Sequence, residues 1–111
     1  MVLAHRAVEG VDIVALSGRL VIAAVPEVRR RLLQIVEQGN GKLVLNLEGV
    51  GFMDSSGLSV LVSVFKAARL KDGEVVLLRL TPTVRSLIEL TRLQQIFEIF
   101  EDEAAALARL R

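Results

Sequence analysis

The sequence contains no cysteine, tryptophan or tyrosine, and only one histidine. The absence of cysteine excludes disulfide bonds, thiol catalysis and cysteine-ligated metal sites. Four phenylalanines are the only large aromatic residues, so few side chains could stack on nucleic-acid bases. The 14 basic and 13 acidic residues give a net charge of +1, which is too small to attract a polyanion. We therefore expect no nucleic-acid partner.

Long apolar runs are also missing. No stretch approaches the ~20 residues that a membrane-spanning helix needs, and the N-terminus lacks the basic and apolar segments of a signal peptide. We therefore predict a cytoplasmic protein without membrane insertion. No glycine-rich phosphate loop of the P-loop or Rossmann type is present, so we expect no cofactor and no metal. The 111 residues, 52% of them hydrophobic, fit one domain over residues 1–111.

Strand and helix patterns alternate along the chain. Two β-rich segments, 2–8 and 11–17, are separated by a turn at Glu9–Gly10, and Gly18 is expected to end the second. Further strands are predicted at 42–47, 74–80 and 95–100. Helices are predicted from Pro26 to Gly39, from Ser55 or Ser56 to about Lys71, after Pro82, and from Glu101 or Asp102 onward. This order predicts a single α/β domain with a mixed central sheet of about five strands and about four helices.

Apolar spacing indicates which helix faces are buried. In the helix that begins near Ser55, the predicted buried stripe is Leu58, Leu61, Val62 and Phe65. In the helix after Pro82, the predicted buried residues are Leu87, Ile88 and Leu90.

The most informative segment runs from Asn46 to Leu58. It reads as a buried strand, a loop through Gly49 and Gly51, and a helix N-terminus that carries Asp54, Ser55 and Ser56. One interpretation is a simple helix cap, because Asp and Ser side chains satisfy unpaired N–H groups there. The other is a phosphorylation site, because a phosphate would meet N–H donors and a favourable dipole at this position.

Residues 52–58, Phe-Met-Asp-Ser-Ser-Gly-Leu, follow Val44-Leu45-Asn46-Leu47 and resemble the signature of the STAS family, the sulphate transporter and anti-sigma-factor antagonist domains. The similarity extends to segments 16–20, 26–28, 96–100 and 103–107, so it covers nearly the whole chain. The chain is most similar to the stand-alone anti-sigma-factor antagonists.

This resemblance implies a switch without catalysis of its own. In stand-alone members, the first hydroxyl residue after the Asp is phosphorylated by the anti-sigma factor, an ATP-binding serine kinase, and here that residue is Ser55. Only the unphosphorylated form binds the anti-sigma factor and so releases sigma, while a Ser/Thr phosphatase reverses the modification. The implied partner-binding residues are Gly18, Arg19, Leu20, Val21, Ile22, Met53, Asp54, Ser55, Ser56, Leu58 and Ser59.

One position departs from the family pattern. Members often carry an Asp shortly after the Gly of the second strand, near the phosphorylation site, and that position corresponds to Val21 here. Loss of this carboxylate predicts less efficient phosphorylation of Ser55 and leaves the fold prediction unchanged.

Two alternatives remain open. The chain could be a STAS subunit of another complex, in lipid transport, secretion or motility regulation, with Ser55 partly structural. A small serine hydrolase could combine Ser55 or Ser56 with His5, although the Gly-x-Ser-x-Gly elbow of such enzymes is absent.

Overall fold

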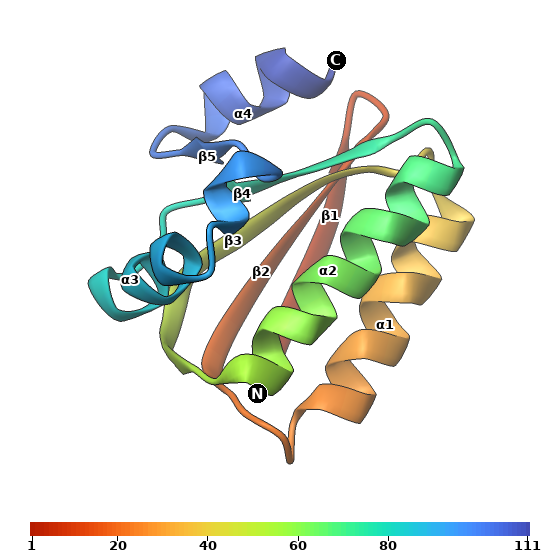
Figure 1. Ribbon diagram of the computed structural model, residues 1–111. Coiled ribbons are helices and arrows are strands. Elements are labelled where there is room, and N and C mark those ends of the chain that lie inside the picture. Colours follow the sequence, from red (N-terminus) through yellow and green to blue (C-terminus); the bar gives the residue numbers. More distant parts are fainter.

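A five-stranded sheet forms the centre of the computed structural model, which describes residues 1–111 (Figure 1). The strands lie side by side in sequence order, and β1 is antiparallel to β2 whereas every later pair is parallel. They are β1 (Val2–Val8), β2 (Val11–Leu20), β3 (Lys42–Met53), β4 (Glu74–Leu78) and β5 (Ile99–Phe100). The predicted α/β domain with a mixed sheet of five strands and four helices is therefore confirmed.

Helices cover both faces of the sheet, but unequally. Each parallel pair is joined by a crossover helix, and crossovers of one hand between neighbouring strands place their helices on one face. These helices are α1 (Val25–Gln38), α2 (Ser55–Leu70) and α3 (Pro82–Leu90). A short 3₁₀ turn, η1 (Leu93–Gln95), leads to β5, and α4 (Glu103–Leu110) then packs on the other face (Figure 1).

The apolar residues form two cores, one on each side of the sheet. The larger lies beneath α1, α2 and α3 and includes Leu45, Leu61 and Ile88. The smaller contains seven buried residues, of which α4 contributes only Ala106 and Leu110. Because β3 is buried on both faces over Leu43–Leu45, it has the continuous apolar run expected of a central parallel strand.

Both central strands are longer than predicted. Gly18 does not end β2, which continues to Leu20, and β3 continues past Leu47 to Met53. The extension is stabilised by parallel pairing of residues 17–20 with residues 49–53. Gly49 is tolerated inside β3 because a side chain there would collide with Ser17, so its lack of a β-carbon lets the strands approach.

Other boundaries and faces also differ from the predictions. β4 ends at Leu78, and β5 has only two residues, because Gln95 belongs to the 3₁₀ turn Leu93–Gln95 and residues 96–98 form no strand. The prediction that Leu90 is buried is wrong: it is 82% exposed, and Val84 lies in the core together with Ile88. In α2, Val62 and Phe65 are only half-buried, while Val60, Val64 and Ala68 join Leu58 and Leu61 in the core.

None of the four helices has both the length and the apolar composition needed to cross a bilayer.

Candidate functional site

The residues singled out by the motif gather where β2 and β3 end. Leu20 pairs with Met53, and the backbone N–H of Asp54 donates to the Leu20 carbonyl over 3.4 Å. From this edge the chain enters α2 directly after Asp54, while the four-residue loop after Leu20 leads into α1. The carboxyl ends of two neighbouring parallel strands thus bring the β2–α1 loop beside the N-terminus of α2.

Asp54 is the N-cap of α2. Its Oδ1 atom accepts hydrogen bonds from the backbone N–H of Ser56 at 3.0 Å, from the backbone N–H of Gly57 at 3.2 Å and from the Ser56 hydroxyl. The hydroxyl bond is the largest cause of a lowered pKa of the Asp54 carboxyl, and N–H groups of Gly57, Ser56 and Ile22 act in the same direction against partial desolvation. The carboxylate is therefore ionised at neutral pH and joins the loop to the helix.

The two adjacent serines differ in what their hydroxyls do. Ser55 is the first residue of α2, its side chain is exposed, and its hydroxyl has no hydrogen-bond partner in the chain. Ser56 is half-buried, and its hydroxyl donates to Asp54. The predicted position of Ser55 at a helix N-terminus is confirmed, and of the two serines only Ser55 presents a free hydroxyl to solvent.

Gly57 is required by the close approach of the two strand ends. A β-carbon at this position would lie 2.5 Å from Met53 Cγ and 2.7 Å from the Leu20 carbonyl oxygen. Both distances are too short for any side chain, so glycine allows the first turn of α2 to sit directly against β2.

A phosphate at this position could meet fewer free backbone donors than expected. Asp54 Oδ1 already occupies the N–H groups of Ser56 and Gly57, and the Asp54 carbonyl accepts from Gly57 at 3.1 Å and Leu58 at 3.2 Å. Of the backbone N–H groups in the first turn of α2, that of Ser55 alone has no acceptor in the chain.

The predicted partner-binding residues separate into two groups by burial. Exposed members are Gly18, Arg19, Ile22, Ser55 and Ser59, and Val21, Asp54 and Ser56 are half-buried. The side chains of Leu20, Met53 and Leu58 belong to the larger core. These three side chains are buried in this structure, so they are not accessible for the predicted partner contact.

Sequence reasoning missed Phe52, which lies beside this edge. Its side chain is 39% exposed, and the Arg19 guanidinium lies 5.0 Å from its ring centroid, in cation–π range. Ile22 is 75% exposed in the neighbouring loop. Alternation along β3 would have turned Phe52 away from buried Met53, but the predicted strand stopped at Leu47 and gave no register there.

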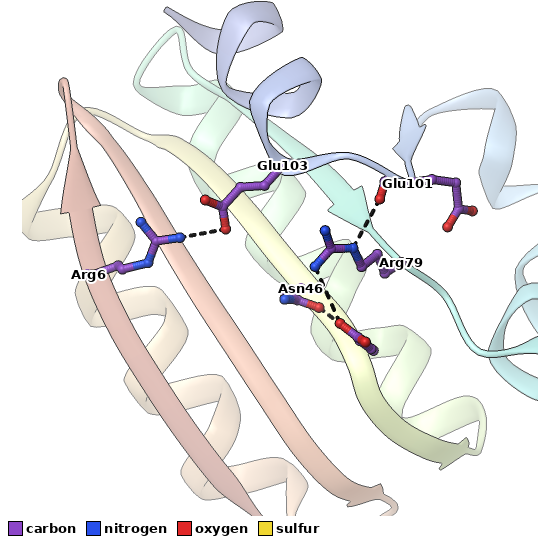
Figure 2. Close-up of polar contacts among 6 residues, drawn as sticks. Arg6, Asn46, Arg79, Glu101 and Glu103 are labelled. Carbon is purple, nitrogen blue, oxygen red and sulfur yellow. Dashed lines mark hydrogen bonds and ion pairs between the residues drawn. The ribbon is translucent and has the colours of Figure 1, made fainter.

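The face of the sheet on which α4 packs carries a network of polar contacts (Figure 2). Arg6 of β1 pairs with Glu103 at the start of α4, and Nη1 of Arg79 lies 3.4 Å from Glu48 of β3. The Arg79 Nε atom also donates to the Glu101 carbonyl at 3.0 Å. These contacts attach the α4 segment to β1, β3 and β4, and they include no nucleophile with a neighbouring base.

The hydrolase alternative is not compatible with the position of His5. His5 lies in β1 opposite Val14, and its Nε2 atom is 2.8 Å from Asp12 Oδ1. Leu20 lies six residue steps after Val14 along β2, a rise of roughly 20 Å at about 3.3 Å per residue. Because a general base must lie within hydrogen-bond reach, His5 cannot activate Ser55.

Comparison with known proteins agrees with this architecture. The family model described as the STAS domain matches residues 3–106. The chain is 35% identical to the anti-sigma F factor antagonist of Paenibacillus polymyxa, over 96% of this chain and 89% of the relative. It is 32% identical to the anti-sigma-B factor antagonist of Staphylococcus aureus, over 79% of this chain and 82% of the relative.

The chain is also similar to a solved structure of an anti-sigma factor antagonist. The anti-sigma factor antagonist SpoIIAA in its unphosphorylated form is 25% identical, and the match covers 97% of this chain and 95% of that chain with a TM-score of 0.83.

Proposed function

Since the chain belongs to the STAS domain family, we propose that it is an anti-sigma factor antagonist whose binding is controlled by phosphorylation of Ser55. Two relatives that match most of the chain carry that name. In this proposal the chain has no catalytic activity and acts in the cytoplasm. Its unphosphorylated form sequesters an anti-sigma factor that is a serine kinase, and a Ser/Thr phosphatase restores that form.

The observation that carries the proposal is the difference between Ser55 and Ser56. A kinase needs an acceptor oxygen that is accessible and free of competing hydrogen bonds. The Ser55 hydroxyl meets both conditions, whereas the Ser56 hydroxyl is held by Asp54. Ser55 Oγ would form a bond to the γ-phosphorus of ATP while the bond from that phosphorus to the β–γ bridging oxygen breaks. ADP would leave, and the hydroxyl proton would pass to a base of the kinase.

Charge and desolvation explain how the modification ends binding. A phosphate adds about −1.5 to −2 charges at pH 7, directly beside the ionised Asp54. The surrounding surface includes the exposed apolar side chains of Ile22 and Phe52. Burial of a partner against these residues would desolvate the phosphate, which is costly for an unpaired charge.

The test uses the serine kinase that is recovered with this protein in a pull-down from native cell extract, purified and supplied with ATP. We expect transfer of one phosphate, located on Ser55 by peptide mapping, and loss of the complex in size-exclusion chromatography. Ser55→Ala serves as the unlabelled control. Label on Ser56, or a complex that persists after complete phosphorylation, would contradict the proposal.

A further inference from the structure

Arg29 of α1 reaches across to α2 beside the proposed phosphorylation site. Helices α1 and α2 lie side by side on one face of the sheet, with their N-terminal ends at the same end (Figure 1). The Arg29 Nη2 atom donates to the Ser59 hydroxyl at 2.9 Å, and Ser59 Oγ donates in turn to the Ser56 carbonyl at 2.6 Å. The Arg29 guanidinium is therefore held against the N-terminal part of α2.

The charge of Arg29 has no acidic partner. Its only hydrogen bond is to a neutral hydroxyl, and it takes part in no ion pair, unlike the adjacent Arg30, which pairs with Glu27 at 2.7 Å. The Arg29 Nε atom is moreover buried without any hydrogen-bond partner. Since buried polar groups are nearly always paired, the unphosphorylated protein leaves this guanidinium incompletely satisfied.

Helix geometry relates Arg29 to Ser55. Ser55 and Ser59 are four residues apart on α2, so they are neighbours on one helix face with β-carbons about 6 Å apart. Helical side chains lean toward the N-terminus, which directs Ser59 and the arginine bound to it toward the first turn. A phosphoryl group on Ser55 would lie about one helical turn from Ser59, within reach of the long Arg29 side chain once that side chain releases Ser59. The backbone N–H groups of Ser56 and Gly57 are already taken by Asp54, and only that of Ser55 has no acceptor in the chain.

We infer that Arg29 binds the phosphate on Ser55 once it is formed, exchanging its bond to Ser59 for charge-assisted bonds to phosphate oxygens. This inference rests on the proposed phosphorylation of Ser55. Guanidinium and phosphate match in geometry and can form two parallel N–H···O bonds. The modified serine would then join α1 to α2 beside the predicted partner-binding residues. Arg29 is thus a phosphate-binding residue that distinguishes the two forms of the protein.

The test needs neither kinase nor anti-sigma factor. Phosphoserine is incorporated at position 55 by genetic code expansion, and the phosphate is titrated by ³¹P NMR in three proteins: wild type, Arg29→Gln and Arg30→Gln. Arg30→Gln is the matched control, because Arg30 is adjacent, exposed and paired on its own helix. A nearby cation favours the dianion, so we expect the phosphate to titrate roughly 0.5 to 1 pH unit lower in wild type and Arg30→Gln than in Arg29→Gln.

A second measurement covers the case in which Arg29→Gln folds poorly. In wild-type protein labelled with ¹⁵N, the Arg29 Nε resonance should shift between the Ser55 and phosphoserine forms, while that of Arg30 stays in place. Equal phosphate titration in all three proteins, or an Arg29 resonance insensitive to the phosphate, would overturn the inference. Both readouts are independent of partner binding. The inference about Arg29 can therefore fail while phosphorylation of Ser55 still controls partner binding, and it can hold when phosphorylation does not control partner binding.

Discussion

The Asp54 carboxylate accepts hydrogen bonds from both the backbone N–H and the hydroxyl of Ser56. This double contact fastens the second serine of the motif to the helix cap and leaves the first serine, Ser55, unbound at the surface. Two chemically identical side chains, adjacent in sequence, thereby differ in exposure and in hydrogen bonding.

Affinity for the anti-sigma factor should fall as the negative charge at residue 55 increases. Ser55→Ala should bind the anti-sigma factor about as well as wild type, Ser55→Asp more weakly, and phosphorylated protein most weakly. A poorly paired, desolvated polar group costs about 1–3 kcal/mol, or roughly ten- to hundredfold in affinity. Calorimetry on the four forms measures the order, with folding checked by circular dichroism. Equal affinity of phosphorylated and unphosphorylated protein would instead favour a structural subunit of another complex.

Exposed apolar residues beside Ser55 should contribute to partner binding. Ile22→Ala and Phe52→Ala should each weaken the complex by roughly tenfold, as expected for interface residues that cost above 1 kcal/mol when truncated. Leu70→Ala is the control, because Leu70 is 88% exposed at the far end of α2. If all three variants bind equally well, the partner contacts another surface.

Gly57 should be far less tolerant of a methyl group than Gly51. Gly57→Ala places its β-carbon against Met53 and the Leu20 carbonyl, and such overpacking costs about 1–3 kcal/mol in the free energy of unfolding. At Gly51 no atom lies within 4 Å of the added carbon, so Gly51→Ala should change stability by about 0.5 kcal/mol or less. Urea denaturation of both variants measures the difference. Equal effects would place the first turn of α2 farther from β2.

Asp54 should stabilise the fold only where it is ionised. Its pKa is lowered in the folded protein, chiefly by the Ser56 hydroxyl, so its contribution is fully present above the unfolded value near ~3.9 and is lost as pH falls through the folded pKa. Asp54→Asn should therefore be less stable than wild type at pH 6, and the difference should shrink below about pH 4. Urea denaturation at a series of pH values measures it. A difference independent of pH would argue against an ionised cap.

Restoring a carboxylate at residue 21 should speed phosphorylation. Val21 lies between Leu20 and Ile22, whose backbone groups both approach Asp54. A side-chain carboxylate there gives the kinase an additional charged group to engage beside the acceptor. Initial rates with the cognate kinase should rise in Val21→Asp and remain unchanged in Ala23→Asp, an exposed control in the same loop. An unchanged rate in both would show that this position does not limit phosphorylation.

Local sequence was enough to predict some features and insufficient for others. The cap at Asp54 and the helix start at Ser55 were predictable because a few adjacent residues determine them. The extent of β3 was underestimated, since Gly49 and Gly51 are typical of loops, and the strand continues there because Gly49 and the residues on both sides of Gly51 pair with β2. Burial of Leu20 and the contact between Arg29 and Ser59 depend on how distant elements pack, which no local pattern encodes.

The thin core beneath α4 has a consequence for how the protein opens. Ala106 and Leu110 are the only buried residues of α4. The helix is otherwise held by half-buried Leu107 and by surface ion pairs, such as Arg109 with Glu74 and Glu98. Elements with few buried apolar contacts form the least protected cooperative units in native-state hydrogen exchange. The α4 amides should therefore exchange well before those of α2. Because α2 lies on the other side of the sheet, such an opening would leave the helix that begins at Ser55 intact.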